Sequence, residues 1–262
     1  MAGLNEAAFN AFVPALVYRT AANSELPSST VAGIASAALL VSAGTGLLSW
    51  LWFRGRPFPS RGLTLAAMIP NNANMGMSLC GLAFGAEGLA LATAYYATTA
   101  FMTFTVGLYV MTGGSNGLRE IFKVPILYAL GCGVVVHEAG LVLPQAIDRG
   151  IEIMGQAAIP LMLFSLGHRL ARTRLGSLRL AGEATVIRIG CGLGLGLLSQ
   201  ALLPLSPTAK HVVVLQAMMP TAVITTVMAE RYKREPELVA STVAVSTLAS
   251  VALLPLLLSR ML

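Results

Sequence analysis

Nine stretches of this chain are apolar and bounded by charged or turn-forming residues. A helix needs about 20 predominantly apolar residues to cross a hydrocarbon core of roughly 30 Å. The runs are continuous rather than alternating, which favours membrane-spanning helices over strands. The expected spans are residues 4–20, 30–53, 62–85, 88–111, 121–143, 151–170, 180–203, 211–230 and 238–259.

The composition agrees with a membrane protein. Only 11% of the residues are charged and the mean hydropathy is +0.76, whereas soluble domains carry about 25% charged residues. These values exclude an ordinary cytosolic domain, a disordered chain and a nucleic-acid binder, although the formal charge is +6. The cysteines Cys80, Cys132 and Cys191 are scattered singly, so we expect no disulfide framework, no metal site and no cofactor.

Lysine and arginine residues lie mainly on one side of the predicted spans. Counted through alternate connections, 12 basic residues fall on one side and 4 on the other, and Arg188 inside a span completes the total of 17. Such residues are retained on the cytoplasmic side of a membrane. We therefore expect the amino terminus in the cytoplasm and the carboxyl terminus outside, in a bacterial inner membrane.

Two proline-centred motifs recur at nearly constant spacing. Residues 67–70 (AMIP) resemble residues 217–220 (AMMP), and residues 12–18 resemble residues 158–164. The spans beside these motifs correspond as well, so four spans of each half of the chain match. An odd unit of five spans, repeated twice, inserts its second copy upside down, as in many secondary transporters.

Only the span at residues 121–143 lacks a partner, which would precede residue 1. We therefore expect an all-α integral membrane fold of nine transmembrane helices, from an inverted 5+5 repeat lacking the first helix, with two broken crossover helices. The expected domains are an amino-terminal repeat of four helices (1–112) and an inverted carboxyl-terminal repeat of five helices (113–262).

The span at residues 62–85 carries the sequence PNNANMG, beginning at Pro70, near its centre. Proline removes a backbone donor and clashes with the preceding turn, and asparagine favours caps over helix interiors. Irregular backbone at this depth persists only inside protein or beside a wet cavity. We expect the helix to stop near Pro70 and to resume with Asn74 as its N-cap, so that the amides of residues 75–77 face the gap.

The corresponding span at residues 211–230 is expected to break at Pro220 and Thr221, leaving free amides at Ala222 and Val223. In inverted copies the two breaks would meet near mid-membrane. Each helix N-terminus carries about half a positive charge, so two facing N-termini suit a carboxylate. The alternative is a pair of kinked packing helices whose asparagines bond to neighbouring helices.

Four stretches resemble the auxin efflux carrier family of membrane transporters, and its bacterial members most closely. They cover most of the chain after residue 60 and read PNNANMGMSLCGLAFGAEGLALATAYY, FKVPILYALGCGVVVHEAGLVLP, GQAAIPLMLFSLGHRL and QAMMPTAVITTVMAERY, the last continuing into STVAVSTLASVALLPLLL.

The resemblance implies ten helices in two inverted five-helix repeats and secondary transport of organic anions such as dicarboxylates, or of auxin in plants. In the family, the asparagines and prolines of the crossover helices line the substrate site. The matching candidates for substrate binding are Pro70, Asn71, Asn72, Asn74, Gly76, Pro220 and Thr221.

The chain departs from the usual family pattern PNTGNxGLP. Asn72 and Ala73 replace the usual Thr and Gly, and Ser78 replaces the usual Pro, so the substrate can differ from that of relatives. The family's first helix is also missing, for which a truncated gene model, an alternative start codon and a nine-helix protein are the three explanations.

Three further residues are candidates for substrate binding or coupling. Gln156 and Ser165 lie in a proline-kinked span and are expected to reach the cavity. Arg188 lies well inside its span, where a charged residue is a functional candidate. The competing interpretation is that Arg188 pairs with Glu183 or extends to the basic cytoplasmic rim.

The sequence therefore predicts a carrier of small organic anions, with a dicarboxylate such as malate or malonate as the first candidate. Its expected partners are this anion, the lipid bilayer and a second copy in a homodimer, with no nucleic acid. The alternatives are a truncated, non-transporting membrane protein or sensor, and a membrane-embedded enzyme. The enzyme is disfavoured because no nucleophile–base pair or metal cluster is expected at one depth.

Overall fold

The computed structural model describes residues 7–23, 26–56, 61–113, 125–172 and 176–261, and these residues are largely helical. The described part of the chain contains no strand, and its only β-type pairing is one isolated antiparallel bridge between Pro70 and Thr221. The expectation of an all-α fold is therefore confirmed for this part of the chain.

Most helices begin or end within a few residues of the predicted spans. In chain order they are η1 (Ala8–Phe12), α2 (Val13–Ala22), α3 (Ser28–Phe53), α4 (Arg61–Met68), η2 (Asn72–Gly76), α5 (Met77–Met102), η3 (Thr103–Gly107), α6 (Leu108–Thr112), α8 (Pro125–Glu138), α9 (Gln145–Arg172), α10 (Leu178–Thr185), η4 (Val186–Cys191), α11 (Gly192–Leu202), α12 (Pro207–Ala217), α13 (Ile224–Tyr232) and α14 (Pro236–Leu258), where η marks a turn of π-helix.

Four continuous helical stretches are long and apolar enough to cross a membrane. Among the described residues these are Ser28–Phe53, Asn72–Thr112, Leu178–Leu202 and Pro236–Leu258. The protein is thus a multi-pass membrane protein. Several of the nine expected spans do not meet this criterion by themselves: α2 has 10 residues, α4, α12 and α13 are short halves of interrupted helices, and the described part of α8 has 14 residues. The stretch Asn72–Thr112 also contains parts of two expected spans.

The 41-residue stretch Asn72–Thr112 is a helical hairpin rather than one rod. Gly85 has φ 64° and ψ −151°, a conformation open to glycine only. The chain reverses there, since a side chain added at Gly81 would lie 3.7 Å from the Cβ of Leu89. The hairpin supplies both the second half of the first interrupted helix and the following span.

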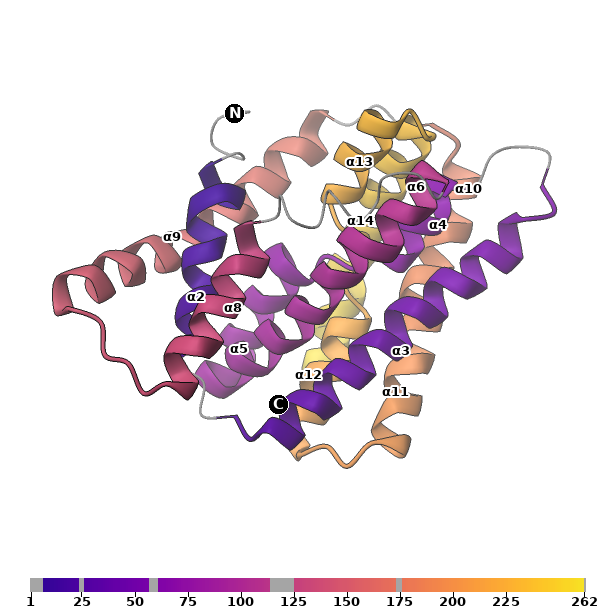
Figure 1. The fold of residues 1–262 in the computed structure, drawn as a ribbon. Coiled ribbons are helices and arrows are strands. Elements are labelled where there is room, and N and C mark those ends of the chain that lie inside the picture. Colours follow the sequence, from indigo (N-terminus) through magenta and orange to yellow (C-terminus); the bar gives the residue numbers. More distant parts are fainter. Residues whose placement is uncertain (1–6, 24–25, 57–60, 114–124, 173–175, 262) are drawn as a thin grey trace.

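The helices form two groups (Figure 1). Helix α2 packs mainly against α8 and α9, whereas α3, α4, α5 and α10 to α14 form the second group, in which α5 packs against α3 and α12. Helix α9 is a single helix of 28 residues with Pro160 inside it. It is thus longer than the short span expected at residues 151–170, because the turn at its amino-terminal end is helical as well.

Polar and apolar side chains are distributed as a bilayer requires. Large apolar side chains such as Leu47, Trp50 and Leu248 are exposed on the outer surface, where lipid would cover them. Hydroxyl side chains such as Thr45 and Ser246 are fully buried between helices. Small polar residues at helix contacts permit close packing and internal hydrogen bonds in membranes.

Candidate functional site

Two helices are interrupted in the middle of the larger group. The first runs through α4 and ends at Met68, and helical structure resumes at Asn72. The second runs through α12 and ends at Ala217, and α13 begins at Ile224. Both interruptions lie at the prolines that the sequence singles out, because proline offers no backbone donor and forces the residue before it out of the helical region.

The two interruptions pair with each other through their backbones. The amide of Asn71 donates to the carbonyl of Pro220 over 2.7 Å, and the amide of Ala222 donates to the carbonyl of Ile69 over 2.9 Å. Backbone groups that would otherwise lack partners at membrane depth are thereby satisfied. We call this short antiparallel pairing of the two interruptions the crossing. It lies among helices.

The first helix resumes earlier than its sequence predicts. Helical structure begins at Asn72 in a π-helical turn, so the carbonyl of Asn71 accepts the amides of Met75 (3.2 Å) and Gly76 (3.0 Å). The expectation that Asn74 caps this helix and that the amides of residues 75–77 face the gap is therefore wrong. In the described structure the amides left without a backbone acceptor are those of residues 73 and 74.

The second helix shows a similar shift. The amide of Ala222 is not free as expected, because the carbonyl of Ile69 accepts it across the crossing. The carbonyl of Ala222 in turn accepts the amide of Thr225 over 3.1 Å. Within the described residues the free amides at this N-terminus belong to Val223, as expected, and to Ile224.

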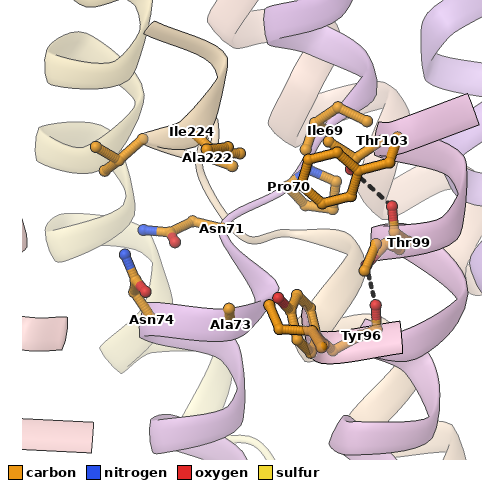
Figure 2. A pocket seen from close by; sticks show the side chains of 14 residues that line it. Ile69, Pro70, Asn71, Ala73, Asn74, Tyr96, Thr99, Thr103, Ala222 and Ile224 are labelled. Carbon is orange, nitrogen blue, oxygen red and sulfur yellow. Dashed lines mark hydrogen bonds between the residues drawn. The ribbon is translucent and has the colours of Figure 1, made fainter. Parts of the chain in front are cut away.

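Both helix N-termini open into one small cavity of about 50 Å³ (Figure 2). It is lined by Ile69, Pro70, Asn71, Ala73, Asn74, Tyr96, Thr99, Ala100, Thr103, Phe104, Ile126, Ala222, Val223 and Ile224. The four residues with free amides are all among them, and no described residue of the lining is acidic. Ile126 belongs to α8, so the cavity lies where the two helix groups meet.

Two side-chain amides in this cavity are buried and lack partners among the described residues. They are the Nδ2 donor of Asn71 and the Oδ1 acceptor of Asn74. Figure 2 shows both side chains on one side of the crossing, with Tyr96 and Thr99 on the other. Because buried amides are almost always hydrogen-bonded, an unpaired pair in a cavity favours a bound ligand or water.

The other predicted residues of the first break hold the crossing together. Asn72 is fully buried and its Nδ2 donates to the Oγ1 of Thr99 over 3.3 Å. Gly76 lies against Gln216, and a side chain at residue 76 would overlap the amide group of Gln216. Neither Asn72 nor Gly76 lines the cavity.

In the second break, Pro220 and Thr221 also lie outside the cavity lining. The Thr221 hydroxyl donates to the carbonyl of Ala66 over 2.9 Å, and its amide donates to the Oγ of Ser246 over 3.1 Å. Thr221 therefore ties the break to both α4 and α14. Of the seven residues predicted to bind substrate, only Pro70, Asn71 and Asn74 line the cavity.

Arg188 lies at the C-terminal ends of α4 and α12, which are the first halves of the two interrupted helices. It is fully buried in the π-helical turn η4. Its Nη1 donates to the carbonyls of Ala67 (2.8 Å) and Met68 (3.3 Å) at the end of α4, and its Nη2 donates to the carbonyl of Ala217 (2.8 Å) at the end of α12. A helix C-terminus carries about half a negative charge, so one guanidinium compensates two of them.

The arginine does not make the pairing that its sequence neighbour offers. Glu183 binds Arg56 through its Oε2 at 2.7 Å and Arg179 through its Oε1 at 3.3 Å. The interpretation that Arg188 pairs with Glu183 or extends to the cytoplasmic rim is therefore wrong. The reason is that the π-helical turn directs Arg188 into the protein, where carbonyls and the Thr45 hydroxyl (3.2 Å) surround it.

Of the two remaining candidates, only Gln156 has a described side chain, and it does not line the cavity. Gln156 is exposed on α9, and its Nε2 donates to the Oε1 of Glu152 over 3.2 Å. The side chain of Ser165 lies outside the described residues.

Some residues of the site were not found from the sequence. Tyr96 and Thr99 line the cavity from the return helix of the hairpin, and both amide atoms of fully buried Gln216 lack partners among the described residues. Polar residues within apolar spans were the available signal for Gln216. Threonine gave no such signal because it is common in buried membrane helices, and tyrosine gave none because it is common at membrane interfaces.

Membrane-spanning helices and two interrupted helices that share a buried cavity are features of a membrane transporter. A family model described as "membrane transport protein" matches residues 114–258, which is more than half of the chain. The chain belongs to this family, which is the auxin efflux carrier family.

Two relatives are described as transporters as well. An uncharacterized transporter of Methanothermobacter thermautotrophicus is 29% identical over 270 residues, covering 97% of this chain and 86% of the relative. An uncharacterized transporter of Methanocaldococcus jannaschii is 26% identical over 204 residues, covering 74% of this chain and 66% of the relative. Family and relatives are transporters, so the protein is a transporter and not an enzyme. Both organisms are archaea, and the resemblance to the bacterial branch stays a prediction.

Proposed function

We propose that the protein is a secondary active transporter of small organic anions, with dicarboxylates such as malate or malonate as its first candidates. The observation that carries this proposal is the cavity at the crossing. Four free backbone amides, on Ala73, Asn74, Val223 and Ile224, belong to residues that line it from two helix N-termini.

The electrostatics of the crossing favour an anion over a cation. Two helix N-termini together contribute roughly one positive charge, and free amides there are a common anion site. The negative ends of α4 and α12 are compensated by Arg188. The unpaired Nδ2 of Asn71 adds a further donor for a carboxylate.

Binding of an organic anion requires the cavity to widen. Its volume is about 50 Å³, whereas pockets for small molecules typically have roughly 300–1,000 Å³. The cavity lies between the group α2, α8 and α9 and the group that holds the crossing, so relative movement of these two groups is the means of opening that we propose. Such movement is the usual basis of alternating access.

The finer topology is part of the same proposal. We infer nine helices arranged as inverted repeats over residues 1–112 and 113–262, an amino terminus in the cytoplasm of a bacterial inner membrane, and a homodimer. The antiparallel pairing of Pro70 with Thr221 supports opposite insertion of the two halves. In this scheme Pro70, Asn71 and Asn74 contact the anion, Asn72, Gly76, Pro220 and Thr221 hold the crossing, and Arg188 positions both helices.

The proposal is tested by uptake of radiolabelled malate and malonate into proteoliposomes containing the full chain. Wild-type protein is expected to show saturable uptake. Asn71→Ala and Asn74→Ala are each expected to raise the KM about tenfold or more, because a hydrogen bond to a charged group contributes about 1.5–3 kcal/mol.

Asn10→Ala is the matched control, since Asn10 is exposed in η1 and does not line the cavity. This variant should transport like the wild type. Absence of saturable uptake of any carboxylate by well-folded wild-type protein would contradict the proposal, as would unchanged uptake in both cavity variants.

A further inference from the structure

A groove of about 720 Å³ lies between α3, α4 and the segment formed by η3 and α6. None of its lining residues lines the crossover cavity. Its volume falls within the range of small-molecule pockets. The anion-binding proposal makes no use of this groove.

The groove has a basic end and an apolar end. Arg54 and Arg61 lie at the basic end, where the chain leaves α3 and enters α4. Leu47, Met102 and Val106 line the apolar end. An amphipathic ligand with an anionic head fits this division.

The positions of the two arginines are determined by their neighbours. The guanidinium of Arg54 lies 5.2 Å from the ring centroid of Trp50, one helical turn earlier. A Cβ added at Gly113, whose φ is 73°, would lie 2.5 Å from Nη1 of Arg61, so Gly113 leaves room for this guanidinium. None of the described residues that line the groove is acidic. Outside the lining, Glu235 accepts a hydrogen bond from the amide of Gly62 and also interacts electrostatically with Arg61.

The groove lies on a part of the surface whose side chains would contact lipid. Leu47, Trp50, Val106 and Tyr109 are all more than two-fifths exposed although they are apolar or aromatic, which is the state of side chains that contact lipid. Tryptophan and tyrosine concentrate at the membrane–water interface. The arginines belong to the side of the membrane that carries most of the basic residues, where anionic lipids are enriched.

We propose that this groove binds one anionic phospholipid, with its phosphate between Arg54 and Arg61 and an acyl chain along Leu47, Met102 and Val106. The site connects to the crossing through α4, which begins at Arg61 and ends at Met68, a partner of Arg188. Occupancy of the groove therefore stabilises the helix that leads into the crossing.

The test is thermal unfolding of the full chain in a neutral detergent. Dioleoyl phosphatidylglycerol is expected to raise the unfolding midpoint by about 3 °C or more above the effect of dioleoyl phosphatidylcholine, because a ligand that binds only the folded state stabilises it. The double variant Arg54→Gln/Arg61→Gln should lose this difference. The control Lys210→Gln/Arg260→Gln removes two charges outside the groove and should keep it.

Two further measurements test whether the ligand is a phospholipid or a free anion, and test the groove with a variant that keeps both arginines. Inorganic phosphate should give no shift, and a shift equal to that of phosphatidylglycerol would overturn the lipid assignment in favour of a free anion. Val106→Trp fills the apolar end without changing charge, and it should weaken retention of phosphatidylglycerol in native mass spectrometry at least threefold. Equal effects of the two phospholipids, or full retention by Val106→Trp, would overturn the proposal.

Discussion

The backbone amide of Asn71 donates to the carbonyl of Pro220 over 2.7 Å. Together with the bond from the amide of Ala222 to the carbonyl of Ile69, it joins two helix interruptions that lie almost 150 residues apart in the sequence. Proline removes a donor from each interrupted helix, and the partner segment supplies the acceptor that the local helix no longer offers. The two breaks therefore stabilise each other, and the N-termini beyond them face one cavity.

Replacement of Asn71 by aspartate tests the sign of the charge at the cavity. Asn71→Asp keeps the size of the side chain but adds a negative charge beside both helix N-termini. The carboxylate would occupy the position of the transported anion, so the KM for anion uptake should rise about 10-fold to 100-fold. Uptake kinetics at pH 7 measure this effect. Uptake that is unaffected or improved would indicate that the transported species is a cation or is neutral.

Arg188 should be required for stability of the crossing. Arg188→Met leaves three backbone carbonyls and two helix C-termini without their cation, and loss of a buried charged partner costs about 3–5 kcal/mol. The stability of Arg188→Lys should lie between those of the wild type and Arg188→Met, because an ammonium lacks the planar fork that hydrogen-bonds to both helix ends. Arg179→Met, on the surface, should change the unfolding free energy by less than about 1 kcal/mol. Thermal unfolding in detergent compares the three, and an Arg188→Met midpoint equal to that of Arg179→Met would refute the assignment.

Gly192 and Gly194 provide a matched pair on one helix. A side chain at Gly192 would overlap the carbonyl of Ala217 and lie 2.7 Å from Nη2 of Arg188, whereas nothing lies within 4 Å of a side chain at Gly194. Gly192→Ala should therefore destabilise the protein by about 1–3 kcal/mol. Gly194→Ala should be neutral or slightly stabilising, because alanine is the better helix former. Similar unfolding midpoints for the two variants would show that α11 does not approach the end of α12 this closely.

The pH dependence of stability should depend partly on Glu235. Burial raises the pKa of this carboxyl, against the hydrogen bond from the Gly62 amide and the charges of Arg234 and Arg61. A carboxyl whose pKa is raised by folding contributes stability below its unfolded pKa and loses it as the pH rises through the folded value. The unfolding midpoint of the wild type should therefore fall relative to that of Glu235→Gln between about pH 4 and pH 7.

Glu230→Gln is the control for this prediction, because Glu230 is exposed at the end of α13. Its midpoint should follow the wild type at every pH. A constant difference between wild type and Glu235→Gln across the range would exclude titration of Glu235 as the cause.

The sequence predicted the class of protein and the places where its helices are interrupted. Apolar length and the scarcity of charge indicate membrane helices, and prolines at residues 70 and 220 indicate the breaks, because these properties act within a few residues of the chain. The free amide of Val223 was predicted for the same reason. The restart of the first helix at Asn72 was not predicted, since it depends on a π-helical turn whose amides donate to the carbonyl of Asn71.

Tertiary structure alone decided which groups meet at the site. The bonds of Arg188 reach Ala67, 121 residues away in the sequence, and Ala217, 29 residues away, and nothing local distinguishes these carbonyls from their neighbours. Tyr96 and Thr99 reach the cavity only because the chain reverses at Gly85. Helix formation and interruption are local events, so the sequence by itself determined them. Hydrogen-bond partners and cavity walls are chosen when distant helices pack, so only the folded structure determined those.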